Sequence, residues 1–246
     1  MLLDLFRSGF SREAVISLIL FIPTILISLT VHEYCHGYAA YLCGDNTAKW
    51  NGRLTLNPIK HLDPIGTLMM LVFRFGYAKP VPVNSRNFKH YRLGLCFVAI
   101  AGPLANLLLA FIGMLSLYIS MEIAPDGIAL IYSGGFRYFD GISSTTMVWM
   151  QFILNFIFAN IALAIFNLLP IPPLDGSRII SSVLPAKLAY YYNKYENYIM
   201  IAVFALLYTN VLDAPINFLT NGLSSAISSI FEMLPFFGNA ASIINF

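Results

Sequence analysis

Long apolar runs alternate with short polar segments along this chain. Four of the runs have at least the roughly 17 apolar residues that a membrane-crossing helix needs, and they cover residues 14–43, 93–120, 146–169 and 196–212. A fifth run, 214–235, contains Asn217, Asn221 and several serines, and it either spans the membrane or lies along its interface. The pattern predicts an all-α polytopic membrane protein with a bundle of about five transmembrane helices.

The connection 44–92 has a different pattern. Gly, Pro and Asn interrupt short β-like runs in NGRLTLNPIK, DPIGT and AKPVPVN. The apolar run 65–73 is too short to cross a membrane on its own. We expect a β-like or re-entrant segment here after the first helix, buried against the bundle or lining a wet cavity, because lipid does not satisfy exposed backbone.

The composition agrees with a membrane protein. Of 246 residues, 58% are hydrophobic and only 11% are charged, and the mean hydropathy is +0.73. The net charge of +2 and the absence of a basic block exclude nucleic acid as an expected partner. Cysteines 35, 43 and 96 form no CxxC pair, so we interpret them as packing residues. We expect residues 1–246 to form a single membrane-embedded domain.

The distribution of basic residues predicts the orientation. Eight Lys and Arg residues lie in 44–92, whereas 121–145 holds only Arg137 with three acidic residues. The positive-inside rule therefore places 44–92 in the cytoplasm and 121–145 outside. Arg7 and Arg12 oppose this weakly. The first apolar run lacks the small-residue cleavage site of a secretory signal, so we expect it to remain as a helix.

The motif His32-Glu33-Tyr34-Cys35-His36 follows directly on the first apolar run. Residues i and i+4 lie about 40° apart around an α-helix, so both imidazoles project from one face and can bind one metal ion. Glu33 projects about 80° from their mean direction, where its carboxylate can reach a metal-bound water. A His, Glu and His within one turn at membrane depth is costly unless it has a function.

Two imidazoles leave a zinc ion one short of the three protein ligands usual in an open catalytic site. Among the acidic residues near apolar runs, Asp175 lies at a proline-rich break with apolar sequence on both sides, in FNLLPIPPLDGSRII. Under the predicted topology Asp175 reaches the same membrane side and depth as His32 and His36. Glu122 and Asp213 fall on the other side, and Glu196, although on the same side, lies in the polar run NKYEN. The alternative for Asp175 is a turn or helix-cap role.

These residues resemble the site-2 protease family of intramembrane zinc metalloproteases. The resemblance includes HEYCH at 32–36, GRLTLNPIKHLDPIGTL at 52–68, AGPLANLLLA at 101–110 and FNLLPIPPLDGSRII at 166–180. It implies that His32, His36 and Asp175 bind one Zn²⁺ per chain and that Glu33 is the general base. The sequence departs from the family pattern in showing no span before the HEYCH helix and no PDZ or CBS module.

The resemblance also implies a function. A zinc-activated water would hydrolyse peptide bonds of transmembrane substrates, with the lipid bilayer as surroundings. The implied location is the cell (inner) membrane, multi-pass, with the active site toward the cytoplasmic side. The oligomeric state is not predicted.

Other polar residues have two interpretations each. Asn106 and Asn167 either hydrogen-bond between helices or hold substrate backbone or an oxyanion. His61 and His90 lie in the polar connection, where we expect solvated or turn residues rather than ligands. Asn57 has no derivable role.

Two other functions compete with proteolysis. A membrane metal-ion transporter or sensor would use the same His, Glu and Asp cluster, but a transport path should offer polar stations along the spans. A scaffold that binds transmembrane helices without catalysis would not need Glu33.

Overall fold

The computed structural model describes residues 12–73, 76–123, 144–209 and 213–234. Within these ranges the regular structure is helical. The helices are α2 (Arg12–Leu42), α3 (Thr47–Trp50), η1 (Pro58–Lys60), α4 (Pro64–Phe73), η2 (Ser85–Asn87), α5 (Tyr91–Ile123), α7 (Ser144–Leu168), α8 (Asp175–Val183), α9 (Ala186–Lys194), α10 (Glu196–Tyr208) and α11 (Asp213–Glu232). Most of the 121–145 connection lies outside the described residues.

Three helices in the described part of the chain are long and apolar enough to cross a membrane. These stretches are Val15–Leu42, Tyr91–Ile123 and Val148–Leu168, within α2, α5 and α7. They correspond to the first three predicted spans and confirm an all-helical membrane-type fold. α10 has 13 residues, so by its described length it falls short of the roughly 20 residues that a span needs. The count of five spans stays a prediction.

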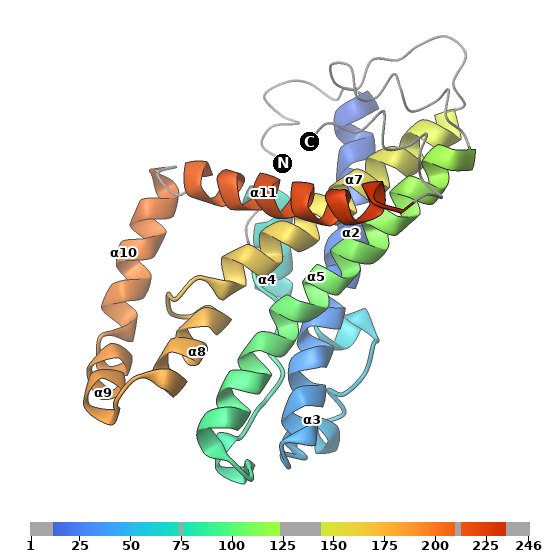
Figure 1. Cartoon of the computed structure of the whole chain (residues 1–246). Coiled ribbons are helices and arrows are strands. Elements are labelled where there is room, and N and C mark those ends of the chain that lie inside the picture. The colour runs from blue at the N-terminus through green and yellow to red at the C-terminus, as the bar shows by residue number, and fades with distance from the viewer. Residues whose placement is uncertain (1–11, 74–75, 124–143, 210–212, 235–246) are drawn as a thin grey trace.

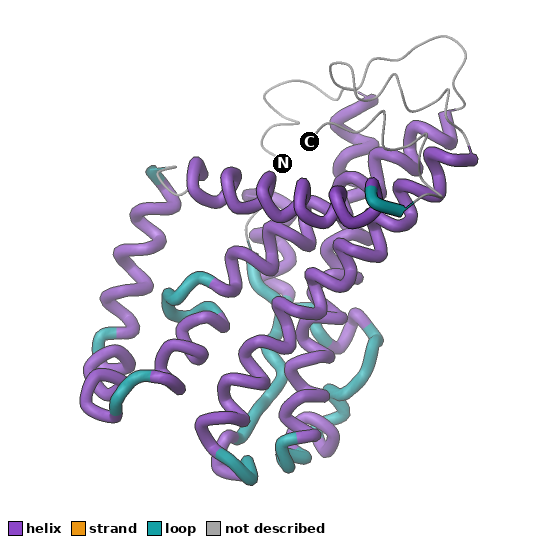
Figure 2. The backbone as a smooth tube through the Cα atoms, viewed as in Figure 1, coloured by secondary structure: helices purple, strands orange, loops and turns teal. Residues whose placement is uncertain are grey.

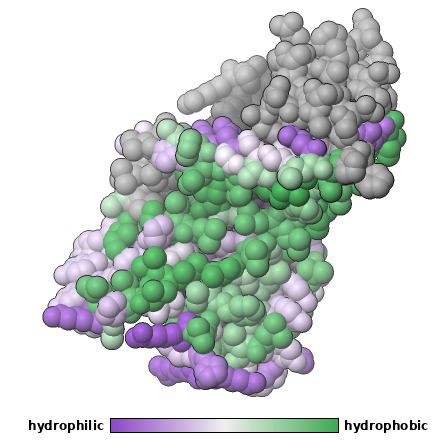
Figure 3. All heavy atoms as spheres, viewed as in Figure 1, coloured by the Kyte–Doolittle hydropathy of each residue, from purple (hydrophilic) through white to green (hydrophobic). Residues whose placement is uncertain are grey.

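The three long helices pack against one another, and α5 contacts both α2 and α7. Figure 1 shows α11 crossing this bundle rather than running along it, while α10 stands away from the three long helices. A broad apolar band covers the middle of the face in Figure 3, and hydrophilic residues gather at its lower end, near α3 and α9. Such a band suits a hydrocarbon environment.

For residues 65–73, the β-like alternative expected in 44–92 was wrong, and the re-entrant alternative stays a prediction. These residues form α4, and the described residues contain no strand (Figure 2). Leu and Met in this run favour helix over strand. Asp63 caps the helix, because its Oδ1 accepts hydrogen bonds from the backbone N–H groups of Ile65 and Gly66 at 3.0 and 2.9 Å. Pro64 occupies the first helical position, where a missing N–H costs nothing.

Asp45 joins the two ends of the connection. This buried carboxylate follows α2 and accepts hydrogen bonds from the Thr47 hydroxyl at 2.5 Å, the Asn84 backbone N–H at 2.7 Å and the Asn87 amide at 2.8 Å. Burial on its own would raise the pKa of Asp45, but these hydrogen bonds outweigh burial and lower the pKa below its usual value. The ionised carboxylate thereby fastens the turn before α5 to the end of α2.

A core of mainly apolar side chains lies along the second half of α5. Large apolar side chains of α5, among them Met114 and Leu117, pack there against α7 and α11. Ile157 of α7 and Phe231 of α11 are buried in the same cluster. Tyr118 adds the polar contact of its hydroxyl with the Ser228 hydroxyl at 2.8 Å. This cluster packs α5 against α7 and α11.

Candidate metal centre

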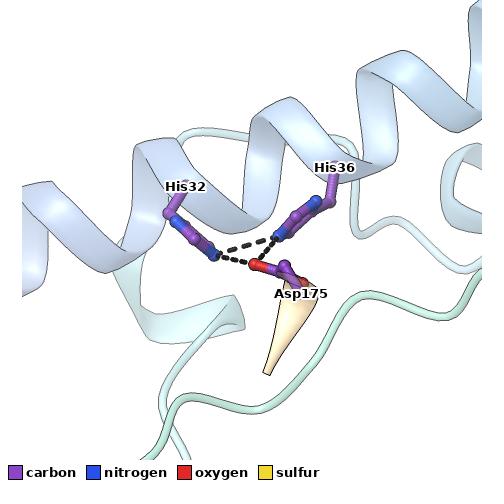
Figure 4. Close-up of side chains that lie close together, drawn as sticks. All are labelled: His32, His36 and Asp175. Carbon is purple, nitrogen blue, oxygen red and sulfur yellow. Dashed lines mark hydrogen bonds and ion pairs between the residues drawn. The ribbon is translucent and has the colours of Figure 1, made fainter. Parts of the chain in front are cut away.

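His32 and His36 lie on one face of α2 and are both buried, as their i, i+4 spacing predicts. Their Nε2 atoms are 2.9 Å apart. Figure 4 shows both rings pointing away from the helix toward the same third side chain, Asp175. Imidazoles this close, with both Nε2 atoms turned to one point, are arranged as ligands of a shared cation.

Asp175 begins α8, directly after the break that separates it from α7. Prolines 170, 172 and 173 prevent the helix from continuing through this break. Gly176 makes the tight return possible, because a Cβ at this position would lie 2.3 Å from the carbonyl oxygens of Leu168 and Leu169. The break therefore places the Asp175 carboxylate back beside α2.

The Asp175 Oδ2 atom lies 3.2 Å from His32 Nε2 and 3.1 Å from His36 Nε2. As a metal ligand the Asp175 carboxylate would be ionised, with Oδ2 facing both Nε2 atoms.

The three atoms fit a zinc ion. Ligands of tetrahedral zinc at about 2.0–2.1 Å from the metal lie roughly 3.3 Å from one another, and the separations here are 2.9–3.2 Å. All three residues are groups that zinc prefers, and they form a His, His and Asp cluster. Three protein ligands leave a fourth position open, which is the arrangement of catalytic sites.

α5 holds the other nitrogen of each imidazole. The Nδ1 atom of His36 lies 2.7 Å from the Val98 carbonyl oxygen, and Nδ1 of His32 lies 2.6 Å from Asn106 Oδ1. A carbonyl oxygen accepts only, so Nδ1 of His36 carries the proton and its Nε2 lone pair faces the cluster. Such partners fix the ring orientation of metal-ligating histidines.

The orientation of the Asn106 amide follows from its own partners. The Phe156 carbonyl accepts from Asn160 Nδ2 at 2.8 Å, so Asn160 Oδ1 must face Asn106 Nδ2, 3.1 Å away. Asn106 Oδ1 is then left to accept from Nδ1 of His32. Both asparagines are fully buried. The Phe156 carbonyl orients the Asn160 amide, which orients the Asn106 amide, so the proton of His32 is placed on Nδ1.

Gly102 lies between these two supports, so Val98, Gly102 and Asn106 form one i, i+4, i+8 stripe of α5. A Cβ at Gly102 would lie 2.4 Å from His36 Nε2 and 2.6 Å from His32 Cε1. Only glycine lets α5 approach the two rings this closely. Sequence reasoning missed the roles of Val98 and Gly102, although the Gly-Pro pair inside an apolar run and its four-residue spacing from Asn106 were a signal.

Glu33 contacts a different part of the chain. Its Oε2 atom accepts a hydrogen bond from the backbone N–H of Val81 at 2.8 Å, and its side chain is partly buried. It lies next to His32 on α2, outside the three-ligand cluster. Because Glu33 is not one of the three clustered residues, its carboxylate is available for proton transfer.

The remaining candidates lie elsewhere. The Asn167 amide donates to the Leu163 carbonyl of its own helix, and the substrate or oxyanion role of Asn106 and Asn167 stays a prediction. His61 is 1% exposed, so the expectation of a solvated residue was wrong, whereas the alternative of a turn residue is confirmed, because His61 closes the turn after η1. Its Nε2 contacts the Thr55 carbonyl. His90 is exposed as expected. Asn57 caps η1 through its hydrogen bond from the Ile59 N–H.

Comparison with known proteins agrees with this geometry. The model of peptidase family M50 matches residues 20–209. The Bacillus subtilis protein named "Putative zinc metalloprotease YwhC" is 41% identical over 215 residues, which cover 86% of this chain and 92% of that protein.

More distant relatives carry the same designation. They are the Rip2 proteins of Mycolicibacterium smegmatis and Mycobacterium tuberculosis, 30% and 29% identical over 162 and 157 residues. The matched parts cover 64% and 61% of this chain, and 54% and 52% of the two Rip2 proteins. No solved structure gives a significant match. Because the family model covers most of the chain and YwhC is similar over nearly its full length, the chain belongs to peptidase family M50, the site-2 protease family.

Proposed function

We propose that this chain is an intramembrane zinc metalloprotease that hydrolyses peptide bonds of transmembrane protein substrates. The observation that carries the proposal is the convergence of His32, His36 and Asp175 to within 3.2 Å of one another, beside Glu33. The site would face the cytoplasmic side of the cell membrane, as the eight basic residues of 44–92 favour.

In this proposal His32, His36 and Asp175 hold one zinc ion per chain. Bound zinc supplies Lewis acidity, which lowers the pKa of a water toward neutrality and polarises the scissile carbonyl. Glu33 removes a proton from the attacking water and later donates it to the nitrogen of the leaving amine. Val98 and Asn106 keep the two imidazoles oriented throughout.

The substrate must present an extended peptide to this site, because the carbonyls of an intact helix are hydrogen-bonded within it. A transmembrane substrate therefore has to unwind locally before cleavage. The glycines and prolines that break helices would favour such unwinding.

The test replaces Glu33 with Gln, which keeps the size of the side chain and removes its capacity to accept a proton. We expect zinc content to stay near one per chain, while cleavage of a reporter transmembrane substrate in proteoliposomes falls by at least about 100-fold. Asp175→Asn is the matched variant, for which zinc content should fall too. Unchanged cleavage by Glu33→Gln overturns the proposal, and zinc flux across liposomes that depends on Glu33 supports a transporter.

A further inference from the structure

The stretch Lys79–Val81 lies against α2 although it has no regular secondary structure. The Val81 N–H donates to Glu33 Oε2 at 2.8 Å. The Val81 side chain is buried and packs over Gly37, one turn further along α2, where a Cβ would be 3.1 Å from its Cγ1. The backbone of this stretch is therefore fixed to the same face of α2 that carries the proposed general base.

Arg53 holds the two residues that precede Val81. Its Nη2 donates to the Lys79 carbonyl oxygen at 2.6 Å and to the Pro80 carbonyl oxygen at 3.3 Å. The Arg53 side chain is 8% exposed, a position where a guanidinium is costly unless hydrogen-bonded. The described residues contain no ion pair between Arg53 and a carboxylate, and its buried Nε has no hydrogen-bond partner among them. The guanidinium is therefore bound through Nη2, by these two backbone carbonyls.

A backbone contact also holds the same stretch. The Lys79 N–H donates to the His61 carbonyl oxygen at 2.9 Å, and His61 is itself buried. Lys79–Val81 is thus held by three separate elements of the fold. The contacts from Arg53, from the His61 carbonyl and from α2 hold this stretch where the Val81 N–H meets Glu33.

We propose that Arg53 is a positioning residue for the general base. It fixes Lys79–Val81 so that the Val81 N–H binds one carboxylate oxygen of Glu33 and leaves the other oxygen directed at the attacking water. A carboxylate with one oxygen bound loses most of its freedom to rotate, and proton transfer requires a base within hydrogen-bonding reach of the proton. This inference rests on the proposed role of Glu33.

The opposite reading of the same contact is a latch, in which the Val81 N–H occupies Glu33 and must be released before catalysis. The two readings differ in sign. If the contact positions Glu33, its removal slows cleavage. If it blocks Glu33, its removal accelerates cleavage.

The test compares Val81→Pro, which removes the N–H, with Val81→Ala, which keeps the N–H and loses the side chain. The position follows Pro80 and lies outside any helix or strand, so proline there removes no helical or sheet hydrogen bond. We expect kcat of Val81→Pro to fall about 10- to 100-fold below that of Val81→Ala, with KM for the reporter substrate within about twofold, because small misplacements of catalytic groups cost this much. Zinc content should be the same in both.

Arg53 is tested by Arg53→Gln and Arg53→Lys. Gln is too short to reach both carbonyls, whereas Lys retains a charged donor, so we expect Lys to restore a large part of the kcat that Gln loses. Amide hydrogen exchange in 76–84 of zinc-loaded protein should become faster in Arg53→Gln and stay slow in Arg53→Lys. This second measurement reports on the backbone contact whether or not the protein cleaves peptides.

Equal kcat for Val81→Pro and Val81→Ala overturns the inference, and a higher kcat for Val81→Pro overturns it in favour of the latch. Unchanged exchange in Arg53→Gln overturns the role of Arg53 itself. None of these results depends on Glu33→Gln, whose loss of cleavage tests the proposed function separately. The proposed function therefore stands or falls on its own variant.

Discussion

The two halves of α5 are built on opposite principles. In the first half, Val98, Gly102 and Asn106 face the histidines with a carbonyl, a missing side chain and an amide. In the second half, large side chains such as Met114 and Leu117 face α7 and α11 in an apolar core. Both stripes are almost completely buried.

The first half of α5 positions the candidate site, whereas the second half stabilises the fold. Close approach and hydrogen bonds orient the imidazoles but remove little apolar surface from neighbours. Packed apolar side chains supply van der Waals contact, the main attraction between helices where lipid surrounds them. Substitutions in the first half should therefore change the metal centre, and substitutions in the second half should change stability with the metal centre intact.

The largest effect is expected for Gly102→Ala, which places a Cβ against both histidine rings. We expect zinc affinity and cleavage to fall about 100-fold, the upper end for residues that support metal ligands. Zinc content measured against a competing chelator checks this. Gly113→Ala is the matched control on the same helix, because its Cβ would meet side-chain atoms of Ile157 and Phe156. If both variants lose zinc equally, the two halves do not differ in the way described.

A smaller effect is expected for Asn106→Leu, which removes the acceptor on His32 Nδ1 and keeps a similar volume. Zinc affinity should fall about 10-fold, because the ring loses its fixed tautomer but keeps its place. Asn160→Leu removes only the next amide in the chain, so its zinc affinity should fall less. Isothermal titration with zinc after chelator treatment measures both. A larger loss in Asn160→Leu would contradict the order of the amide chain.

The stability contributed by Asp45, in the polar connection after α2, should depend on pH, whereas that of the apolar core beside the second half of α5 should not. The pKa of Asp45 in the folded chain lies below its ordinary value of 3.8, so its stabilisation is fully present above about pH 4 and is lost as pH falls through the lowered pKa. At pH 7, Asp45→Asn should cost about 2 kcal/mol, since charged hydrogen bonds are lost. The difference in thermal midpoint between wild type and variant, measured in detergent, should narrow below pH 4. A constant difference would show that Asp45 is not ionised in the folded chain.

The smallest effect is expected in the apolar core, for Ile157→Val. Loss of one buried methylene should lower the free energy of unfolding by about 1 kcal/mol. Zinc affinity and cleavage at 25 °C should match wild type, and the stability difference should not change with pH. Denaturant unfolding in mixed micelles measures it. Reduced zinc affinity in this variant would mean that register between α5 and α7 is transmitted to the site.

The sequence predicted the parts of the site that are local or that sit at a marked break. The i, i+4 spacing predicted the shared face of His32 and His36, and the prolines before Asp175 predicted where a distant carboxylate could return. The sequence analysis did not predict the contributions of Val98 and Gly102, because a backbone carbonyl and an absent side chain carry no chemical signature. Their roles depend on which face of α5 meets α2, and that is set by packing.

The error at α4 has a local cause. Residues 65–73 have no polar alternation, and a short apolar run does not distinguish a strand from a buried helix. The decisive signal was Asp63 followed by Pro64, a cap and a first helical residue that precede the run. His61 was misjudged for the opposite reason, since polar neighbours in the sequence suggested water around a side chain that tertiary contacts bury.

The cluster joins residues 139 positions apart, from His36 to Asp175. A ribosome adding about 5–20 residues per second completes that interval in roughly 7–28 s. α2 is completed at the start of this interval and α5 is made within it, while Asp175 has not yet been synthesised. Under the proposed function, a nascent chain therefore has no complete metal centre until Asp175 is added.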